Sequence, residues 1–418
     1  MLYDRWRQVA KENPRELALR DLAGGKHWTF SDLHAAASLA APASAPVAFP
    51  EGISAEFVLR VLRAWREGKA VCPLEANQGP PVFTGLPAGC VHLKTTSATT
   101  RAPRVVAFTA EQLIADVDNI VATMGLRPEW PNLGVISLAH SYGFSNLVLP
   151  LLLRGIPLIL LDSPLPEAVR RAATGFEAIT LPAVPALWRA WHDAGAISPN
   201  VRLAISAGAP LPLALEQAVF KATGTKIHNF YGASECGGIA YDATATPRED
   251  GSYVGVPMKN VQLSLNDVGC LEVRSKAVGL TYWPEPQSSL GQGCYRTSDL
   301  AELKNGAVFL HGRASDLINV AGRKVPPETI ERILLAHPQV RECLVFGVPS
   351  AEEERSETIV ACVALGGGAT GKALKQFLLE RLPPWQVPRE WMFVDSLGAN
   401  QRGKSSRAEW RRKFVEGR

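Results

Sequence analysis

The stretch YRTSDLAELKNGAVFLHGRASDLINVAGRKVPPETIE, residues 295–331, has the pattern of two hairpins followed by a helix. Asn305-Gly306 separates two short alternating runs and predicts a tight hairpin turn. A second hairpin is expected to turn at Ala321-Gly322-Arg323. Pro326-Pro327 then opens a helix whose apolar residues fall on one face, namely Ile330, Ile333 and Leu334. We expect a domain joint within this stretch.

Three segments here follow the order of motifs known from one superfamily. They are Tyr295-Arg296-Thr297-Ser298-Asp299, Gly312-Arg313-x-x-Asp316 and Gly322-x-x-Val325-x-Pro327-Glu328-x-Ile330-Glu331. Together they resemble consecutive motifs of the adenylate-forming superfamily, which contains acyl- and aryl-CoA synthetases, peptide-synthetase adenylation domains and firefly luciferase. The resemblance extends over essentially residues 50–410. It implies ATP as a substrate and a small, mobile C-terminal domain.

Composition excludes several other classes of protein. With 418 residues, 46% hydrophobic and 20% charged, the chain suits a large globular domain plus a smaller one. A net charge of +4 is too small to indicate a nucleic-acid partner, and the basic residues at 402–418 fit a solvated terminal helix. Seven cysteines without a C-x-x-C pair indicate neither a zinc site nor a disulfide framework, so a reducing cytoplasm is expected.

Neither a signal peptide nor a membrane span is expected. The first residues, MLYDRWRQVAKEN, contain acidic side chains and no apolar core. The most hydrophobic run, residues 147–161, is interrupted by Pro150, Arg154, Gly155 and Pro157.

Alternating strand and helix patterns fill residues 133–242. Strands are expected at 134–139, 157–161, 178–181 and 201–206, and helices from 144 and at 167–174, 184–193 and 212–223. This order predicts an α/β fold, with a large N-terminal domain of parallel or mixed sheet covered by helices and ligands at the carboxyl ends of the strands. Residues 269–283 suggest a small barrel-like subdomain. We therefore expect a large domain at 1–314 and a small α+β domain at 315–418.

A hydroxyl-rich segment, TTSATTRAPR at 95–104, separates two apolar runs. From the residues alone, a polyphosphate loop and a plain surface turn both remain open, and a Walker A loop is excluded. The superfamily places a Ser/Thr/Gly-rich phosphate loop ending in Pro-Lys here. The resemblance therefore assigns nucleotide binding to Thr96, Ser97, Thr99, Thr100 and Arg104. Ala98 and Arg101 replace the usual glycines and Arg104 the lysine, so the backbone has less freedom to close over the triphosphate.

Three further loops follow expected strands. His140-Ser141-Tyr142-Gly143 matches the His-x-x-Gly segment of the family, which implies a catalytic histidine between the acid and the nucleotide; an isolated histidine is more often a satisfied core residue. Ser206-Ala207-Gly208-Ala209 resembles the adenine-side turn, with Gly208 and Ala209 near the base. Tyr231-Gly232-Ala233-Ser234-Glu235 resembles Tyr-Gly-x-Thr-Glu, and Cys236 excludes the rival G-x-S-x-G hydrolase turn.

The resemblance gives each residue of the third loop and of the C-terminal motifs a role. Tyr231, Gly232 and Ala233 would bind adenine, Ser234 would donate to phosphate, and Glu235 would hold Mg²⁺ on the phosphate oxygens. Asp299 would accept hydrogen bonds from the ribose hydroxyls, and Arg313 would reach the ribose or the α-phosphate. Gly403-Lys404 retains the end of the last motif, so Lys404 would be the catalytic lysine of adenylation. Ser315 corresponds to the hinge between the domains.

The expected function is ATP-dependent activation of a carboxylic acid, with transfer of the acyl group to coenzyme A or to the phosphopantetheine arm of an acyl carrier protein. No carboxylate lies near His140 to hold an ammonium group, so an aryl or fatty acid is favoured over an amino acid. Order along the chain suggests an acid pocket walled by Val184, Trp188, Ala207, Gly237 and Gly238. Two alternatives stay open: a non-catalytic binding protein with the same fold, and an adenylate-forming enzyme with an amine acceptor.

Overall fold

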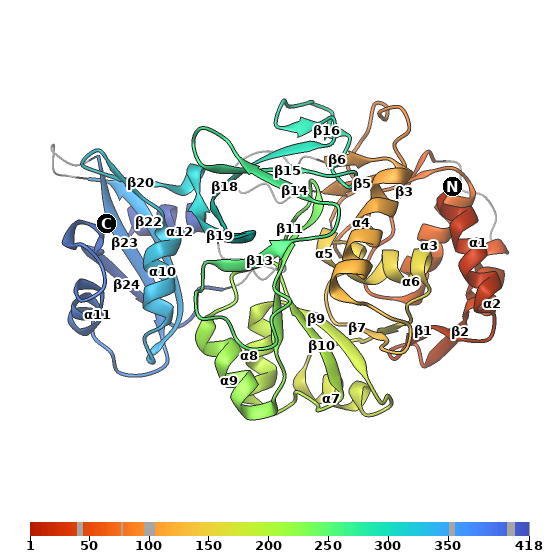
Figure 1. Ribbon diagram of the computed structural model, residues 1–418, viewed down its shortest axis with the longest axis horizontal. Coiled ribbons are helices and arrows are strands. Elements are labelled where there is room, and N and C mark those ends of the chain that lie inside the picture. The colour runs from red at the N-terminus through yellow and green to blue at the C-terminus, as the bar shows by residue number, and fades with distance from the viewer. Residues whose placement is uncertain (40–44, 77, 96–104, 351–355, 399–405, 418) are drawn as a thin grey trace.

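The computed structural model describes residues 1–417 except 40–44, 77, 96–104, 351–355 and 399–405. A large N-terminal α/β domain and a smaller C-terminal domain lie side by side along the long axis of the molecule (Figure 1). The first helices lie at one end and the C-terminal domain at the other. The predicted fold class is confirmed.

The central sheet of the large domain has 14 strands within the described ranges. Its middle is parallel, in the order β11-β10-β9-β7-β8-β1, and β2 and β12 pair antiparallel at either end of this run. The bounds are β1 Leu17–Asp21, β2 Lys26–Thr29, β7 Asn132–Gly134, β8 Leu158–Leu160, β9 Ile179–Ala183, β10 Val201–Ser206, β11 Ile227–Ala233 and β12 Gly237–Tyr241. Strands such as β9 are buried along their whole length, as expected where helices cover both faces of a parallel sheet.

An antiparallel extension continues this sheet through β13, which pairs with both β12 and β19. The added strands are β13 Tyr253–Pro257, β14 Gln262–Leu265, β15 Cys270–Arg274, β17 Leu290–Gly291, β18 Cys294–Lys304 and β19 Ala307–Arg313. Asn305 and Gly306 have φ of 53° and 76°, so the predicted tight turn between β18 and β19 is confirmed. This hairpin places Asp299 directly opposite Arg313.

A second sheet of the large domain has the order β16-β6-β5-β4-β3. Its strands are β3 Val47–Ala48, β4 Ala70–Val71, β5 His92–Thr95, β6 Val105–Phe108 and β16 Thr281–Trp283. The expected phosphate loop, 96–104, joins β5 to β6 and lies outside the described residues. On its other edge β6 pairs with β16, which comes from far along the chain.

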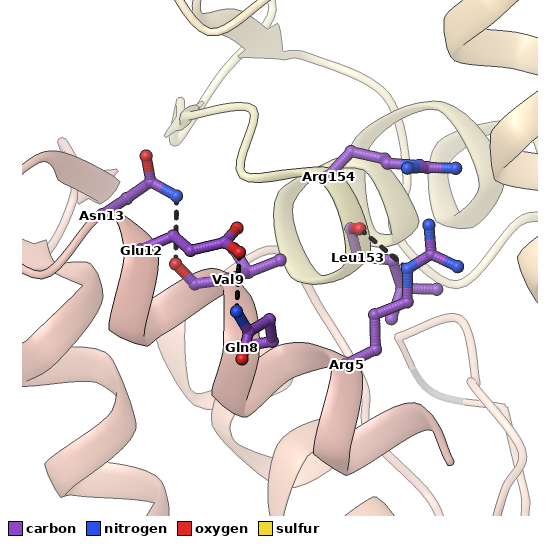
Figure 2. Close-up of a pocket in the computed structure, with 7 residues that line it drawn as sticks. All are labelled: Arg5, Gln8, Val9, Glu12, Asn13, Leu153 and Arg154. Carbon is purple, nitrogen blue, oxygen red and sulfur yellow. Dashed lines mark hydrogen bonds between the residues drawn. The ribbon is translucent and has the colours of Figure 1, made fainter.

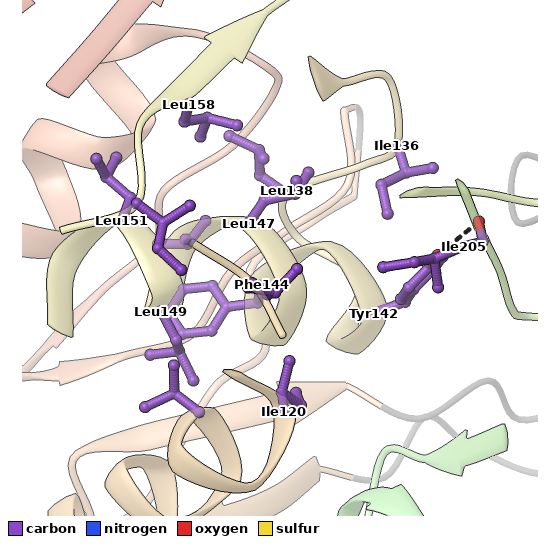
Figure 3. Close-up of a cluster of buried hydrophobic side chains, with 14 of the residues drawn as sticks. Ile120, Ile136, Leu138, Tyr142, Phe144, Leu147, Leu149, Leu151, Leu158 and Ile205 are labelled. Carbon is purple, nitrogen blue, oxygen red and sulfur yellow. Dashed lines mark hydrogen bonds between the residues drawn. The ribbon is translucent and has the colours of Figure 1, made fainter. Parts of the chain in front are cut away.

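Helices connect many of the strands of the large domain. They are α1 Leu2–Glu12, α2 Phe30–Ser38, α3 Ala55–Arg66, α4 Ala110–Met124, α5 Ser141–Gly143, the π-helix η1 Phe144–Val148, α6 Leu149–Arg154, α7 Pro166–Ala173, α8 Pro185–Asp193 and α9 Leu213–Thr223. Thr109 and Gln112 form the expected capping box at the start of α4. Ile120 of α4 lies with Phe144, Leu147 and Leu149 in one apolar cluster, which packs η1 and α6 against α4 (Figure 3). None of the described helices has the length and hydropathy that crossing a membrane requires.

The prediction of a strand at 134–139 is wrong beyond Gly134, because β7 ends at that residue. Ser137 Oγ donates to both carboxylate oxygens of Glu75, at 2.9 and 2.8 Å, and accepts from the amide of Ala139 at 3.2 Å. These hydrogen bonds of the Ser137 side chain, one local and two to a distant residue, compete with the strand ladder. Residues 135–140 therefore leave the sheet and carry His140 to the start of α5.

The C-terminal domain has its own apolar cores around a three-stranded sheet, β22-β23-β24. Its elements are η2 Ala314–Asp316, β20 Ile318–Val320, β21 Arg323–Val325, α10 Pro327–Leu335, β22 Val340–Pro349, β23 Glu357–Leu365, α11 Gly371–Leu379, η3 Pro384–Gln386, β24 Glu390–Val394 and α12 Arg407–Glu416. Ala321 and Gly322 have φ of 50° and 79°, so the second predicted hairpin is confirmed as well.

Candidate active site

Three predicted nucleotide-binding residues meet where β11, β18 and β19 come together. The hydroxyl of Tyr231 donates to Oδ2 of Asp299 at 2.5 Å, and Nε of Arg313 donates to Oδ1 of Asp299 at 2.9 Å. Burial, together with the adjacent Asp299 carboxylate, raises the pKa of Tyr231 well above its ordinary value, so the phenol stays protonated and donates. The fold thus builds one polar cluster from segments that are far apart in the sequence.

The loops that follow β7 and β11 are joined by a hydrogen bond between two hydroxyls. Oγ of Ser141 lies 3.0 Å from Oγ of Ser234. His140 precedes Ser141 as the N-cap of α5, and its Nδ1 accepts from the amide of Tyr142 at 3.3 Å. Because β7 and β11 are parallel, their carboxyl ends lie at the same edge of the sheet, where ligands of such sheets bind. Sequence reasoning did not single out Ser141 as a site residue.

Glu235 is held by a residue that sequence reasoning missed. The hydroxyl of Tyr282 donates to Oε1 of Glu235 at 2.9 Å, and the amide of Gly279 donates to the Glu235 carbonyl at 2.8 Å. Burial raises the pKa of the Glu235 carboxyl, and the hydrogen bond from Tyr282 opposes this shift. No local pattern marks Tyr282, because its position depends on the distant pairing of β16 with β6.

The expected adenine-side turn follows β10. Gly208 has φ of 87°, and a Cβ there would lie 3.3 Å from the side chain of Val184. The amide of Ala207 donates to the carbonyl of Ala183 at 3.2 Å, which holds the turn containing Ala209 beside the end of β9. Glycine at 208 thus supplies both the left-handed backbone and the close approach.

Close packing also explains the glycines around β11 and β12. A Cβ on Gly232 would lie 2.7 Å from the carbonyl oxygen of Gly237, beside Ala233 in the same turn. A Cβ on Gly238 would lie 2.2 Å from Sδ of Met258. Gly237 has φ of 70° and packs against the carboxylate of Asp116. The loop with Ser234 and Glu235 is therefore bounded by positions that accept only glycine.

Trp188, an expected pocket residue, is fully buried within the core of the large domain. Its Nε1 donates to the carbonyl of Ile205 at 3.1 Å, and its ring contacts Trp191 edge to face at 5.3 Å. The hydroxyl of Tyr142 donates to the same carbonyl at 3.4 Å (Figure 3). Trp188 and Tyr142 thus both support β10 just before Ala207.

Several predicted residues lie outside the described ranges. They are Thr96, Ser97, Thr99, Thr100, Arg104 and Lys404. The residues that flank them are described: β5 and β6 border the first group, and Gly398 and Ser406 border the segment that contains Lys404.

Ser315, the predicted hinge, lies in η2 between β19 and β20. Its neighbour Asp316 accepts from Nη1 of Arg407 at 2.8 Å, and Nη2 of Arg407 donates to Glu331 at 2.8 Å. Nη2 also lies 2.9 Å from Glu328. Arg407, the first residue of α12, thus connects this helix to η2 and α10.

A surface pocket lies elsewhere, between α1 and α6 (Figure 2). Its lining contains none of the predicted site residues; it consists of Arg5, Gln8, Val9, Glu12, Asn13, Leu153 and Arg154. It therefore has no part in the site at the carboxyl ends of the strands.

The motifs and the geometry agree with a comparison to known families. A family model described as AMP-binding enzyme matches residues 65–283, and the AMP-binding enzyme C-terminal domain matches residues 329–404. The chain belongs to the AMP-binding enzyme family. The first match spans the expected phosphate loop, His140, the Tyr231–Glu235 loop and Tyr282, and the second ends at Lys404.

Relatives within the AMP-binding enzyme family include named CoA ligases. The mitochondrial malonate–CoA ligase ACSF3 of Mus musculus is 27% identical over 366 residues, covering 75% of this chain and 63% of that protein. This chain thus spans less than two thirds of the length of that ligase. A probable 2-succinylbenzoate–CoA ligase of Mycobacterium tuberculosis is 29% identical over 340 residues, covering 77% of this chain and 84% of that protein.

A solved structure of the AMP-binding enzyme fold superimposes along the whole chain. ATP-bound MatB from Rhodopseudomonas palustris aligns with a TM-score of 0.86 at 20% identity, covering 99% of both chains. This likeness establishes the fold.

Proposed function

We propose that this protein activates a carboxylic acid with ATP and then passes the acyl group to a thiol. A carboxylate oxygen of the acid attacks the α-phosphorus, the bond from that phosphorus to the pyrophosphate oxygen breaks, and pyrophosphate leaves. The sulfur of the thiol then attacks the acyl carbon of the adenylate, the bond from that carbon to the AMP oxygen breaks, AMP leaves and the thiol proton is released. The observation that carries this proposal is the joining of Tyr231, Asp299 and Arg313 in one cluster at the ligand-binding edge of the sheet.

Nucleotide recognition is assigned to that cluster and to the nearby glycine turns. Tyr231, with Gly232 and Ala233, would contact adenine on one side, and Gly208 with Ala209 on the other. Asp299 would accept from the ribose hydroxyls. Both of its oxygens already accept one hydrogen bond, yet each carboxylate oxygen has a further lone pair. Arg313, which is bound to Asp299, would extend to the ribose or the α-phosphate.

Mg²⁺ fits the donors that the site offers. The described residues hold no group of three or more metal-ligating side chains, and Glu235 supplies hard carboxylate oxygens. Mg²⁺ prefers one or two carboxylates together with substrate phosphate and water. Bound on the phosphate oxygens, the ion would neutralise charge as pyrophosphate departs. Ser234 would donate to phosphate, and His140 would lie between the acid and the nucleotide.

Tyr282 is proposed as a positioning residue for Glu235. Tyr282→Phe removes the 2.9 Å hydrogen bond but keeps the ring. We expect adenylation to slow roughly 10-fold at subsaturating Mg²⁺, because a hydrogen bond to a charged group contributes about 1.5–3 kcal/mol. Excess Mg²⁺ should recover most of the rate. A rate loss that is the same at every Mg²⁺ concentration would assign Tyr282 a purely structural role.

The acceptor step is assigned to movement of the C-terminal domain about Ser315, with the domain boundary between residues 314 and 315. Ser315→Pro should spare pyrophosphate release and suppress thioester formation. Proline suits the first turn of a short helix such as η2, so the present conformation is kept, while its fixed φ restricts rotation. Ser315→Ala is the matched control and should leave both steps unchanged. Equal loss of both steps in Ser315→Pro would contradict the hinge.

The acid is proposed to be aryl or fatty, and the thiol to be coenzyme A or the phosphopantetheine of an acyl carrier protein. 2-Succinylbenzoate, the acid named for one relative, contains an aryl ring and supports this class, whereas malonate, named for the other, supports only a carboxylic acid in general. An amine acceptor is the alternative end point. A reducing cytoplasm stays a prediction, and the seven cysteines, all unpaired, are consistent with it.

Pyrophosphate release from MgATP tests the proposal. The acid panel should contain benzoic, hydroxybenzoic, cinnamic and fatty acids, each with and without hydroxylamine as acceptor. Release that depends on one class of acid is the expected result. If no acid of the panel supports pyrophosphate release, although ATP still raises the unfolding temperature, a nucleotide-binding protein without turnover would be favoured.

A further inference from the structure

A buried cluster of charged and polar side chains lies behind the loop that carries Glu235. Oδ2 of Asp116, in α4, accepts from Nζ of Lys94 at 3.4 Å and from Oγ of Ser145 at 2.6 Å. Lys94, in β5, also donates to Ser145 at 3.1 Å. The side chains of Lys94 and Asp116 are only 3% and 2% exposed. The cluster therefore holds one positive and one negative charge away from water.

Three buried polar atoms in or beside this cluster, one of Asp116 and two of His92, have no hydrogen-bond partner among the described residues. Oδ1 of Asp116 is buried and has no hydrogen-bond partner among the described residues. His92, two residues before Lys94 on the same face of β5, is fully buried, and neither of its ring nitrogens has a partner in that part of the chain. Burial, and then the nearby charge of Lys94, lower the pKa of His92 well below its ordinary value, so the ring is neutral.

Stability alone gives a poor account of this arrangement. Buried ion pairs contribute little net stability, because the loss of hydration offsets their attraction. An unpaired buried carboxylate oxygen makes the balance worse, and native proteins seldom keep one without a function. Apolar residues of similar size would fill the same space between α4 and η1 at lower cost.

The position of the cluster connects it to the proposed acid site. Ser145 follows Ser141 by four residues, and Ser141 is bound to Ser234 at the reacting end. Gly237, the first residue of β12, follows Ser234 by three residues and lies against Asp116. A Cβ on Gly237 would lie 1.9 Å from Oδ1, so only glycine at this position lets the carboxylate pack against the turn that carries Ser234. Ser141, beside the place proposed for the reacting carboxylate, and Ser145, in the cluster, are thus separated by a distance of the order of one helical turn, about 5 Å.

We infer that Lys94, Asp116 and Ser145 form the polar far end of the acid pocket, where Oδ1 of Asp116 accepts a hydrogen bond from a hydroxyl or amino group of the acid. This inference rests on the proposed acid activation. The acid is then a small one, about one ring in length, with a hydrogen-bond donor opposite its carboxylate. The ammonium of Lys94, which donates to Oδ2, offsets the charge of the buried Asp116 carboxylate.

The test compares acids of equal size in the wild-type enzyme. For pyrophosphate release, kcat/KM is measured with 3- and 4-hydroxybenzoate, 3- and 4-aminobenzoate, and the methylbenzoates that replace the donor by a methyl group. At least one donor acid should exceed its methyl isostere by roughly 10- to 100-fold, the scale of one hydrogen bond to a charged acceptor. The hydroxy and amino arms identify which donor the site takes.

Substitutions then test whether Lys94 and Asp116 cause the preference for donor acids over methyl isosteres. The double variant Lys94→Met with Asp116→Leu replaces both charges by apolar groups and should reverse the preference towards the methyl isostere. Asp116→Asn, which keeps the shape, should reduce the preference several-fold and decides the question if the double variant does not fold. Asp118→Asn is the matched control, since Asp118 lies in the same helix, is half-buried and pairs with Arg5 and Arg154; it should keep the wild-type preference.

The outcomes separate the inference from the proposed function. If the wild type releases pyrophosphate equally well with donor acids and their methyl isosteres, the inference is overturned and the proposed function stands. The inference is likewise overturned if Asp116→Asn keeps the full preference. If no acid in this panel or among fatty acids supports release, the proposed function fails and the inference fails with it.

Discussion

Alanine in place of Lys404 is expected to slow acid-dependent pyrophosphate release by roughly 10²- to 10³-fold, the scale of removing one preorganised charge donor. By resemblance, Lys404 places its ammonium between the carboxylate and the α-phosphate, where negative charge accumulates. Thioester formation from preformed acyl-adenylate should be nearly unchanged, because that step does not need the lysine. Measuring the two half-reactions separately tests both statements.

The residues on either side of Lys404 are held to the C-terminal domain, and α12 offers a second lysine for a control variant. Nε1 of Trp410 donates to the carbonyl of Leu397 at 3.1 Å, and Arg407 is held by Asp316 and Glu331, so both flanks are fixed to the C-terminal domain. Lys413→Ala removes the same charge from the exposed side of α12, where Lys413 pairs with Glu409. That variant should keep its activity. Undiminished pyrophosphate release in Lys404→Ala would end its assignment as the adenylation lysine.

Gly143→Ala is expected to cost about 3 kcal/mol of unfolding free energy and most of the activity, because the methyl group overpacks a tight contact. A Cβ at this position would lie 2.0 Å from the carbonyl oxygen of Ser137. To relieve that overlap, the loop that carries His140 must move away from α5. Urea unfolding measures the first effect, and pyrophosphate release measures the second.

Gly79→Ala is the matched control for this substitution. A Cβ on Gly79 meets nothing within 4 Å, and its φ is not positive. We expect its unfolding free energy to stay within about 0.5 kcal/mol of the wild type, as for most surface substitutions. If the two alanine variants unfold alike, the contact between Gly143 and Ser137 does not constrain the loop. The glycine of the His-x-x-Gly segment would then need another explanation.

Local signals in the sequence predicted the local features of the fold. The turns at Asn305-Gly306 and Ala321-Gly322, and the capping box at Thr109, depend only on neighbouring residues, and all three are confirmed. The strand expected to run to Ala139 was wrong because the side chain of Ser137 binds Glu75, which is 62 residues away. A partner at such a distance leaves no mark on a local pattern.

The same limit applies to the candidate site. Motif order identified Tyr231, Asp299 and Arg313, and the structure brings them into contact. Tyr282 and the Lys94–Asp116 pair were missed, because each depends on packing between elements that are distant along the chain. A buried lysine and aspartate cannot be told from surface residues until the helix and the strand that carry them are placed.

The pairing of β6 with β16 also bears on how the chain folds as it is synthesised. The free edge of β6 finds its partner only when residues 281–283 have left the ribosome, long after residues 105–108. At 5–20 residues per second, that interval lasts roughly 10–35 s. During this time a strand buried in the mature protein exposes unpaired backbone groups, which are a template for pairing between nascent chains. Chains that end before Thr281 should therefore aggregate, whereas chains that extend past Trp283 should not.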